Sequence, residues 1–211
     1  VAADFGRIPK PKRVLLPQYT LDPAQAGERS VTLRRSGGAP MLMVGYHVPA
    51  GSDPDFAAVE MLPAVLGDEP SERLHKRLTE RQLAAGTFGF SWSMAEPTVL
   101  MFGAQLAPGQ ALDAAREALL STLETVAAEP ITTEELERAR ARWLNDWDQR
   151  FTNPETVGLL LSESIAQGDW RLFFLGRDRV RDVKLADVQR VSTQYLIAGN
   201  RTLGSYVPTD K

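Results

Sequence analysis

Two histidines, His47 and His75, are the only imidazole side chains in this sequence, which has no cysteine. A catalytic zinc site needs about three protein ligands and an open position for water. His47 lies in an apolar stretch without a second histidine two or four residues away, so we expect it to have a structural role. The H-x-x-E-H string of zinc peptidases is also absent. We therefore predict no catalytic, cofactor-binding or metal-binding residue in this chain.

Glu72 and His75 have the i, i+3 spacing of a ligand pair in di-iron proteins. That chemistry needs a second pair and two further glutamates from other helices, and no second pair is present. We therefore expect Glu72 and His75 to lie on a solvated helix face. The sequence also lacks a G-x-S-x-G elbow, a phosphate-binding G-x-x-x-x-G-K-[ST] loop and a dinucleotide-binding G-x-G-x-x-G string.

Two further clusters share one predicted helix. The basic cluster consists of Arg138, Arg140 and Arg142. Glu134 precedes Arg138 by four residues, which predicts a local ion pair, and we expect the rest to be solvated, with contact to an acidic partner domain as the alternative. The aromatic cluster consists of Trp143, Trp147 and Phe151. Core packing is the simpler interpretation of the aromatic cluster, and a contact between domains is the alternative.

Composition narrows the class of protein. The chain has 211 residues, 43% of them hydrophobic, so it can bury a core as one domain. A net charge of −3 provides no basic field for nucleic acid, and no apolar run reaches the roughly 18–20 residues that span a bilayer. We expect neither nucleic-acid binding nor a membrane span. Because the first residue is valine, we also expect a processed protein or a fragment.

Alternating and continuous apolar runs predict the strands. In residues 28–35, Val31 and Leu33 fall on one face, which predicts a half-buried strand. Residues 41–48 are nearly all apolar, which predicts a central strand covered on both faces. Residues 87–94 place their large side chains on one face, residues 98–106 return antiparallel, and residues 201–207 form a last strand. Gly86 and Gly89 in this pattern indicate close packing.

Stripes at helical spacing predict the helices. The first begins at Asp53-Pro54, contains Pro63 and ends near Gly67, and a second begins at Ser71. The others cover residues 110–126, a segment after the capping box of Thr132 and Glu135, residues 153–168, residues 169–183 with an interruption near Gly176, and residues 185–195. In the 153–168 helix we expect these side chains to face inward: Val157, Leu160, Leu161 and Ile165.

This order of elements predicts an α+β fold, with helices packed on a mainly antiparallel sheet. Four prolines and several basic residues predict that residues 1–27 form a linker or leader, so residues 28–211 form the single α+β domain.

A series of short strings gives a more specific clue. In chain order they are Asp22-Pro23-x-Gln25-x-Gly27-Glu28-Arg29, Gly45-Tyr46-His47-x-Pro49, Pro54-Asp55-Phe56, Leu66-Gly67-Asp68, Ser71-x-Arg73-Leu74 and Arg201-Thr202-Leu203-Gly204. Each is weak alone, but their order and spacing resemble the second domain of the pitrilysin/insulinase family of zinc metallopeptidases. The resemblance implies the insulinase-like, LuxS/MPP-like metallohydrolase fold.

The resemblance also implies a function. In this family one domain carries zinc, and a later domain often supplies an arginine and a tyrosine, seven residues apart, that contact the substrate. The matching positions here are Thr79 and Gly86, so this domain lacks both signatures. The resemblance therefore implies a non-catalytic domain that supports a preceding zinc-bearing domain of the same polypeptide and helps to enclose an extended peptide substrate. Zinc is expected in that preceding domain and not in this chain.

A rival hypothesis from another class remains open. Some relatives have lost catalysis and serve as structural or interaction subunits of larger complexes, and the presence of H-x-x-E-H upstream of this segment would distinguish the two. A self-contained hydrolase that uses His47 or His75 is a third and weaker hypothesis. By resemblance to bacterial relatives, we expect a periplasmic location.

Overall fold

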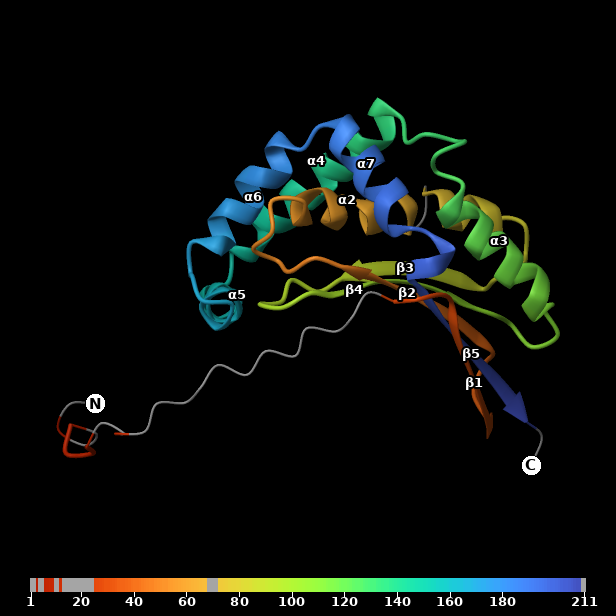
Figure 1. Cartoon of the computed structure of the whole chain (residues 1–211), viewed down its shortest axis with the longest axis horizontal. Helices are drawn as coiled ribbons and strands as arrows, with labels where there is room; N and C mark the ends of the chain where they lie inside the picture. Colours follow the sequence, from red (N-terminus) through yellow and green to blue (C-terminus); the bar gives the residue numbers. More distant parts are fainter. Residues whose placement is uncertain (1–2, 4–5, 10–11, 13–24, 68–71, 210–211) are drawn as a thin grey trace.

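The computed structural model describes residues 3, 6–9, 12, 25–67 and 72–209. It confirms an α+β fold in which helices pack on a mainly antiparallel sheet (Figure 1). The strands are β1 (Arg29–Ser36), β2 (Met41–Val48), β3 (Gly86–Ser91), β4 (Thr98–Gln105) and β5 (Arg201–Thr209). Most of the expected leader, and Ser71 at the expected start of the second helix, lie outside the described residues.

The helices follow the expected order along the chain. They are α2 (Phe56–Leu66), the π-helix η1 (His75–Thr79), α3 (Leu112–Glu124), α4 (Thr133–Arg150), α5 (Pro154–Ala166), α6 (Leu172–Asp182), α7 (Leu185–Tyr195) and the 3-10 helix η2 (Ala198–Asn200). The predicted capping box at the start of α4 is present, because Thr132 accepts a hydrogen bond from the Glu135 amide and Glu135 accepts one from the Thr132 amide.

The sheet is completed by the last strand of the chain. The strand order is β1-β5-β2-β4-β3, so β5 lies between the first two strands and pairs parallel with β1 and antiparallel with β2. The connection from β1 to β2 must therefore pass the end of β5. Gly37 and Gly38 make this connection with φ of +81° at both positions, a conformation that side chains disfavour. The Tyr206 hydroxyl on β5 donates a 2.6 Å hydrogen bond to the Gly37 carbonyl.

Helix α2 occupies the centre of the molecule. Ten of its residues are buried, between the sheet on one side and α4, α6 and α7 on the other. A helix that is apolar on all sides is expected in such a position. Gly67 and Gly89 let the end of α2 approach β3, because a Cβ on Gly89 would lie 3.3 Å from the Gly67 Cα and 2.8 Å from the Phe102 ring. This contact confirms the close packing expected for Gly89.

Two expectations about strand burial were wrong. All eight residues of β1 are exposed, with Val31 at 61% and Leu33 at 46%, because β1 is the outermost strand and projects with β5 beyond the helices (Figure 1). On β2, alternate residues beginning at Leu42 are buried under the helices, whereas Met41, Met43 and His47 are only partly buried. Figure 1 shows the helices on one face of the sheet, so β2 is covered on that face and not on both.

Two expectations about helices were wrong in part. Of the side chains expected to face inward in α5, Val157, Leu160 and Leu161 are partly buried, whereas Ile165 is 61% exposed. Helix α5 lies beside the connection between β3 and β4, where the Ser93 hydroxyl donates to Gln167, and it packs mainly on α6, so it has little surface to bury against. Helix α6 continues through Gly176 without interruption, because that residue keeps a helical conformation.

Candidate interaction surface

The two histidines lie on different elements. His47 is on β2, on the same face as Met43 and Gly45, and its carbonyl oxygen accepts a 2.9 Å hydrogen bond from Asn200. His75 is the first residue of η1 and is partly buried. Within the described ranges, no group of three or more His, Asp or Glu side chains is placed to hold a metal ion. The described side chains therefore do not fit the donor set of a zinc site, and we assign no catalytic step to them.

Glu72 is fully buried, so the expected solvated position was wrong for this residue. Its carboxylate accepts hydrogen bonds of 3.2 and 3.1 Å from the Arg138 guanidinium, and Arg142 lies 3.6 Å away. A buried carboxylate is costly unless it is paired and hydrogen-bonded, which explains why two arginines of α4 point at it. The predicted local pair of Arg138 with Glu134 was therefore wrong, since Arg138 turns toward Glu72 instead.

The basic cluster serves the fold of this domain. Arg140 forms a 2.6 Å ion pair with Glu137 and donates to the Val183 carbonyl. Arg142 donates a 2.8 Å hydrogen bond to the carbonyl of Ala64 on α2. Together with Arg138, which is 44% exposed, these arginines join α4 to its neighbours, so each has a partner within this domain. Contact of the cluster with an acidic partner domain stays a prediction.

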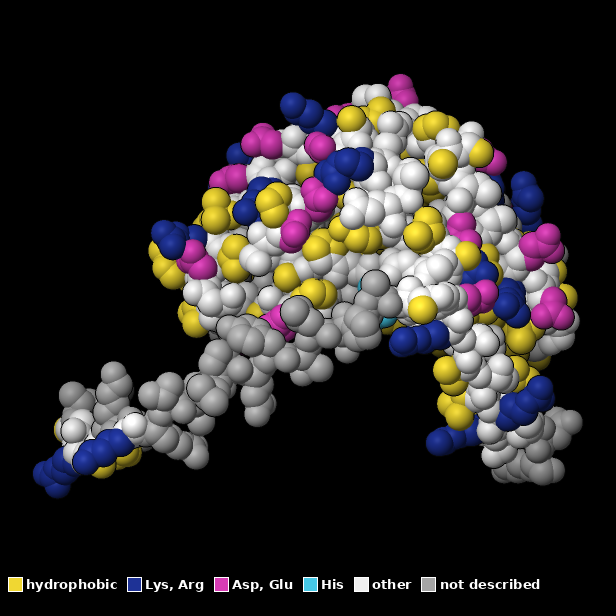
Figure 2. Space-filling model, in the orientation of Figure 1, with side chains coloured by type: hydrophobic (Ala, Val, Ile, Leu, Met, Phe, Trp, Pro, Cys, Tyr) yellow, Lys and Arg dark blue, Asp and Glu magenta, His cyan; other side chains and the backbone are white. Residues whose placement is uncertain are grey.

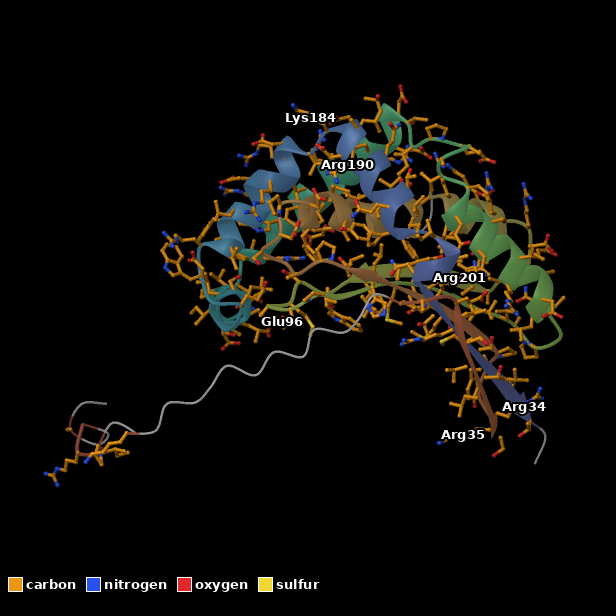
Figure 3. The ribbon with its side chains drawn as sticks, viewed as in Figure 1. Arg34, Arg35, Glu96, Lys184, Arg190 and Arg201 are labelled. Carbon is orange, nitrogen blue, oxygen red and sulfur yellow. The ribbon has the colours of Figure 1, made fainter. Side chains whose placement is uncertain are left out.

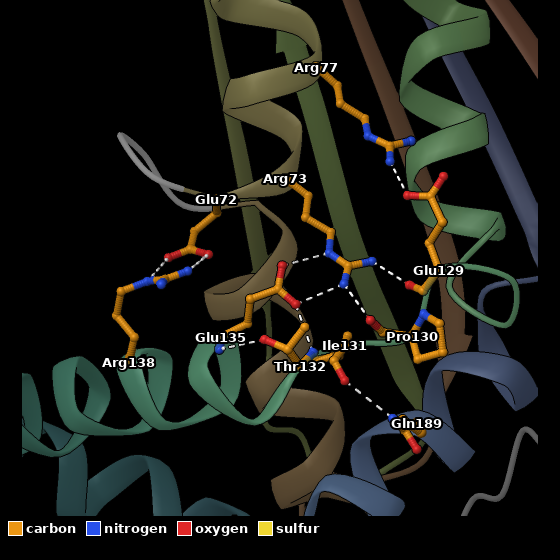
Figure 4. A network of polar contacts seen from close by, with 10 residues as sticks. All are labelled: Glu72, Arg73, Arg77, Glu129, Pro130, Ile131, Thr132, Glu135, Arg138 and Gln189. Carbon is orange, nitrogen blue, oxygen red and sulfur yellow. Dashed lines mark hydrogen bonds and ion pairs between the residues drawn. The ribbon is translucent and has the colours of Figure 1, made fainter.

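Arg73 holds the loop before α4 through several hydrogen bonds (Figure 4). Arg73 donates two 2.8 Å hydrogen bonds to the Glu135 carboxylate, and it also donates to the carbonyls of Glu129 and Pro130. Gln189 on α7 holds the same loop through the Ile131 carbonyl at 3.2 Å. Because Glu135 also belongs to the capping box, this network ties the segment before η1 to the first turn of α4. Its role is structural.

The aromatic cluster is largely core packing, as expected. Trp147 is 5% exposed and contacts Phe151, Phe173 and Phe174, with the Arg177 guanidinium 4.7 Å from its ring centroid. Trp143 packs against the core as well. Phe151 is 41% exposed at the end of the cluster. The two positions that match the family's substrate-contacting pair are Thr79, the last residue of η1, and Gly86, the first residue of β3.

Burial and ion pairing shift the pKa of several acidic groups of the domain. Burial, reinforced by the nearby Glu124 carboxylate, raises the pKa of Tyr46, whose hydroxyl donates a 2.9 Å hydrogen bond to Glu124. Arg201 joins Glu124 to Glu28, and its hydrogen bond lowers the pKa of Glu28. Burial raises the pKa of Glu60 on α2, and a hydrogen bond with Trp143 opposes part of that rise. These groups link elements of the core and do not converge on a substrate-sized cleft.

The sheet face opposite the helices carries large apolar side chains. We define the central apolar face as these side chains of β3, β4 and the residue after β3: Phe88, Phe90, Trp92, Val99 and Met101. The Phe88 and Phe90 rings stack 6.1 Å apart, and the Trp92 ring meets Phe90 edge-on at 4.7 Å. Trp92 is 47% exposed. No described helix lies over this face (Figure 1).

The sequence predicted that the aromatic residues of β3 share one face, and this is confirmed. It did not predict that the face is uncovered. A signal existed in β2, where Met, Gly and His alternate with the apolar residues Leu42, Val44, Tyr46 and Val48, and in β4, where the polar Gln105 ends the uncovered side. Such alternation is typical of a sheet with one buried face. Among the described residues, no helix has the length and apolar character needed to cross a membrane.

Comparison with known proteins places these observations in a family. A family model described as the peptidase M16 inactive domain matches residues 1–142. The zinc protease PqqE of Helicobacter pylori is 25% identical over 179 residues, which are 84% of this chain and 40% of that protein. The chain therefore spans less than half the length of this curated relative.

Solved structures agree with the family match. The inactive peptidase domain of a candidate zinc protease from Bordetella parapertussis has a TM-score of 0.78 and 50% sequence identity, over 85% of this chain and 96% of that chain. A protease from Helicobacter pylori has a TM-score of 0.89 and 23% identity, over 98% of this chain and 51% of that chain. At this lower identity the likeness shows the shared fold only.

Proposed function

The chain belongs to the peptidase M16 inactive-domain family, and from that premise we propose that it is a non-catalytic domain of a zinc metalloendopeptidase. Its proposed work is to support a zinc-bearing domain of the same polypeptide and to form part of the wall around an extended peptide substrate. The zinc belongs to that other domain in this proposal, because the donor set here does not suit the metal.

The central apolar face is the observation that carries the proposal. Neighbouring apolar side chains that stay partly exposed, as Phe88, Phe90, Val99 and Met101 do beside the exposed Trp92, are typical of an interaction site, because leaving them in water costs free energy. We propose the zinc-bearing domain as its occupant, since the curated relative is more than twice as long as the segment matched here. An interface with large aromatic side chains at its centre suits a permanent contact between domains.

Peptide enclosure needs a second feature besides docking. A sheet edge can bind an extended peptide through backbone hydrogen bonds, with little demand on sequence. The sheet ends at β1 on one side and at β3 on the other. A wall that contributes such an edge holds peptides without a catalytic residue of its own.

Charged substitutions on the central apolar face test whether the zinc-bearing domain docks there. Phe90→Glu combined with Met101→Glu should weaken binding to the separately produced zinc-bearing domain of the parent protein by at least about tenfold, because a carboxylate would be buried without a partner. The measurement is sedimentation velocity over a concentration series. The matched control is Leu159→Glu with Ile165→Glu, which changes two exposed apolar residues of α5.

The control should bind as the unaltered chain does. Equal binding by the unaltered chain and the Phe90→Glu/Met101→Glu variant would refute the proposed docking face. A parent protein whose upstream domain lacks H-x-x-E-H would instead support the alternative, a catalytically inactive subunit of a larger complex.

A further inference from the structure

A two-stranded arm of the sheet carries a second surface, made of residues other than those of the central apolar face. The arm consists of β1 and the paired part of β5, and it projects beyond the helices (Figures 1 and 2). β1 is the outermost strand in the order β1-β5-β2-β4-β3, so within the described part of the chain no strand pairs with its outer edge. That edge presents backbone donors and acceptors over eight residues.

An apolar pocket lies on one side of the arm. It has a volume of about 140 Å³ and is lined by Val31, Leu33, Met41, Met43, Gly204, Ser205 and Tyr206. Val31 and Leu33 point to the same side because residues two apart on a strand share a face. A strand added along β1 would place alternate side chains beside Val31 and Leu33, at the rim of this pocket.

The charge on the arm has one sign. β1 and β5 contain no aspartate or glutamate, and β1 contains three arginines, Arg29, Arg34 and Arg35. All three are exposed, and none has an acidic side chain within ion-pair distance among the described residues. Figure 3 shows Arg34 and Arg35 near the end of the arm, extending to opposite sides of it.

Exposed edge strands are commonly protected from unwanted pairing by charged residues, and the arginines alone would fit that role. Protection does not account for Val31 and Leu33, which remain 61% and 46% exposed beside a pocket. Apolar side chains at alternate positions, an open edge and basic flanks together match the requirements for binding a strand of opposite charge.

We propose that the outer edge of β1 binds an extended acidic peptide whose alternate residues are apolar. The peptide adds as a further strand. Its apolar side chains lie beside Val31 and Leu33, and its carboxylates lie on the other side of the arm, where Arg34 extends, while Arg35 adds positive charge at the end of the arm. This inference deepens the proposed function, since it names a class of peptide and a place on the wall for it. The inference concerns residues outside the central apolar face. A failure to bind the peptide would therefore not change the result expected in the docking test.

The test uses this 211-residue chain and a labelled eight-residue peptide in which leucine or valine alternates with glutamate. Binding is measured by fluorescence anisotropy. Arg34→Glu with Arg35→Glu should raise the Kd by at least about tenfold, since the contact of Arg34 with the peptide's carboxylates becomes repulsive and the positive charge at the end of the arm is reversed. Lys76→Glu with Arg81→Glu makes the same change in net charge at exposed positions near the other edge of the sheet, and it should alter the Kd by less than about twofold.

Two further probes separate edge pairing from simple charge attraction. A peptide with lysine in place of glutamate should not bind. Two further peptides carry N-methyl groups, one on its odd-numbered amides and the other on its even-numbered amides. One of these two patterns should abolish binding and the other should leave it intact, because a strand points only every second amide at its neighbour. Absence of peptide binding, an equal effect of the two double variants, or indifference to both methylation patterns would each overturn the inference. Circular dichroism confirms that the variants are folded.

Discussion

Among single residues, the buried carboxylate of Glu72 has the clearest physical role. It has no exposed surface, and the guanidinium groups of Arg138 and Arg142 approach it from α4. Its partners are 44% and 31% exposed, so water screens them more than it screens Glu72. Sequence spacing could not reveal the pair of Glu72 with Arg138, because the two residues are 66 positions apart along the chain. The nearer Glu134 offered a plausible local partner, and local spacing therefore misled.

We predict that Glu72→Gln lowers the free energy of unfolding by about 2 kcal/mol, because it replaces charge-assisted hydrogen bonds in a buried position. Glu134→Gln is the matched control, and it should leave the midpoint of unfolding almost unaltered, since Arg138 does not depend on Glu134. Urea denaturation followed by circular dichroism measures both. A Glu72→Gln protein as stable as the unaltered one would show that the ion pair contributes no net stability.

At the scale of elements, local pattern predicted the type and order of most helices and strands. The capping box at Thr132, the start of α5 at Asn153-Pro154 and the aromatic alternation of β3 are all local signals, and each is present in the structure. Burial was less predictable, because it depends on what lies opposite an element. The exposed α5 and the exposed β1 both carry apolar patterns that would suit a covered position.

The contact between α2 and β3 gives a prediction at this scale. Gly89→Ala should destabilise the domain by about 1–3 kcal/mol, because the added Cβ would lie 2.8 Å from the Phe102 ring and 3.3 Å from the Gly67 backbone. Gly158→Ala on α5 is the control. A Cβ added there would meet no atom within 4 Å, and alanine favours a helix, so stability should stay equal or rise. The measurement is the midpoint temperature of thermal unfolding for both variants. A Gly89→Ala midpoint equal to that of the unaltered chain would contradict the close packing of α2 on β3.

At the scale of the whole molecule, the fold class was predictable and the pairing of its strands was not. The mainly antiparallel sheet with packed helices follows from the order of elements. Insertion of β5 between β1 and β2 joins Ser30 to Leu203, a pairing that no local spacing encodes. The expectation of no catalytic or metal-binding residue stays a prediction. The uncovered sheet face was not predicted, although the alternation of buried and partly buried residues in β2 carries a signal of it.

The most direct test of that account is hydrolysis of a quenched fluorescent peptide, measured for this chain alone, for the separately produced zinc-bearing domain, and for their mixture. We predict that this chain alone is inactive and holds no stoichiometric zinc, and that adding it to the zinc-bearing domain raises hydrolysis. Hydrolysis by this chain alone that a chelator abolishes would contradict the account.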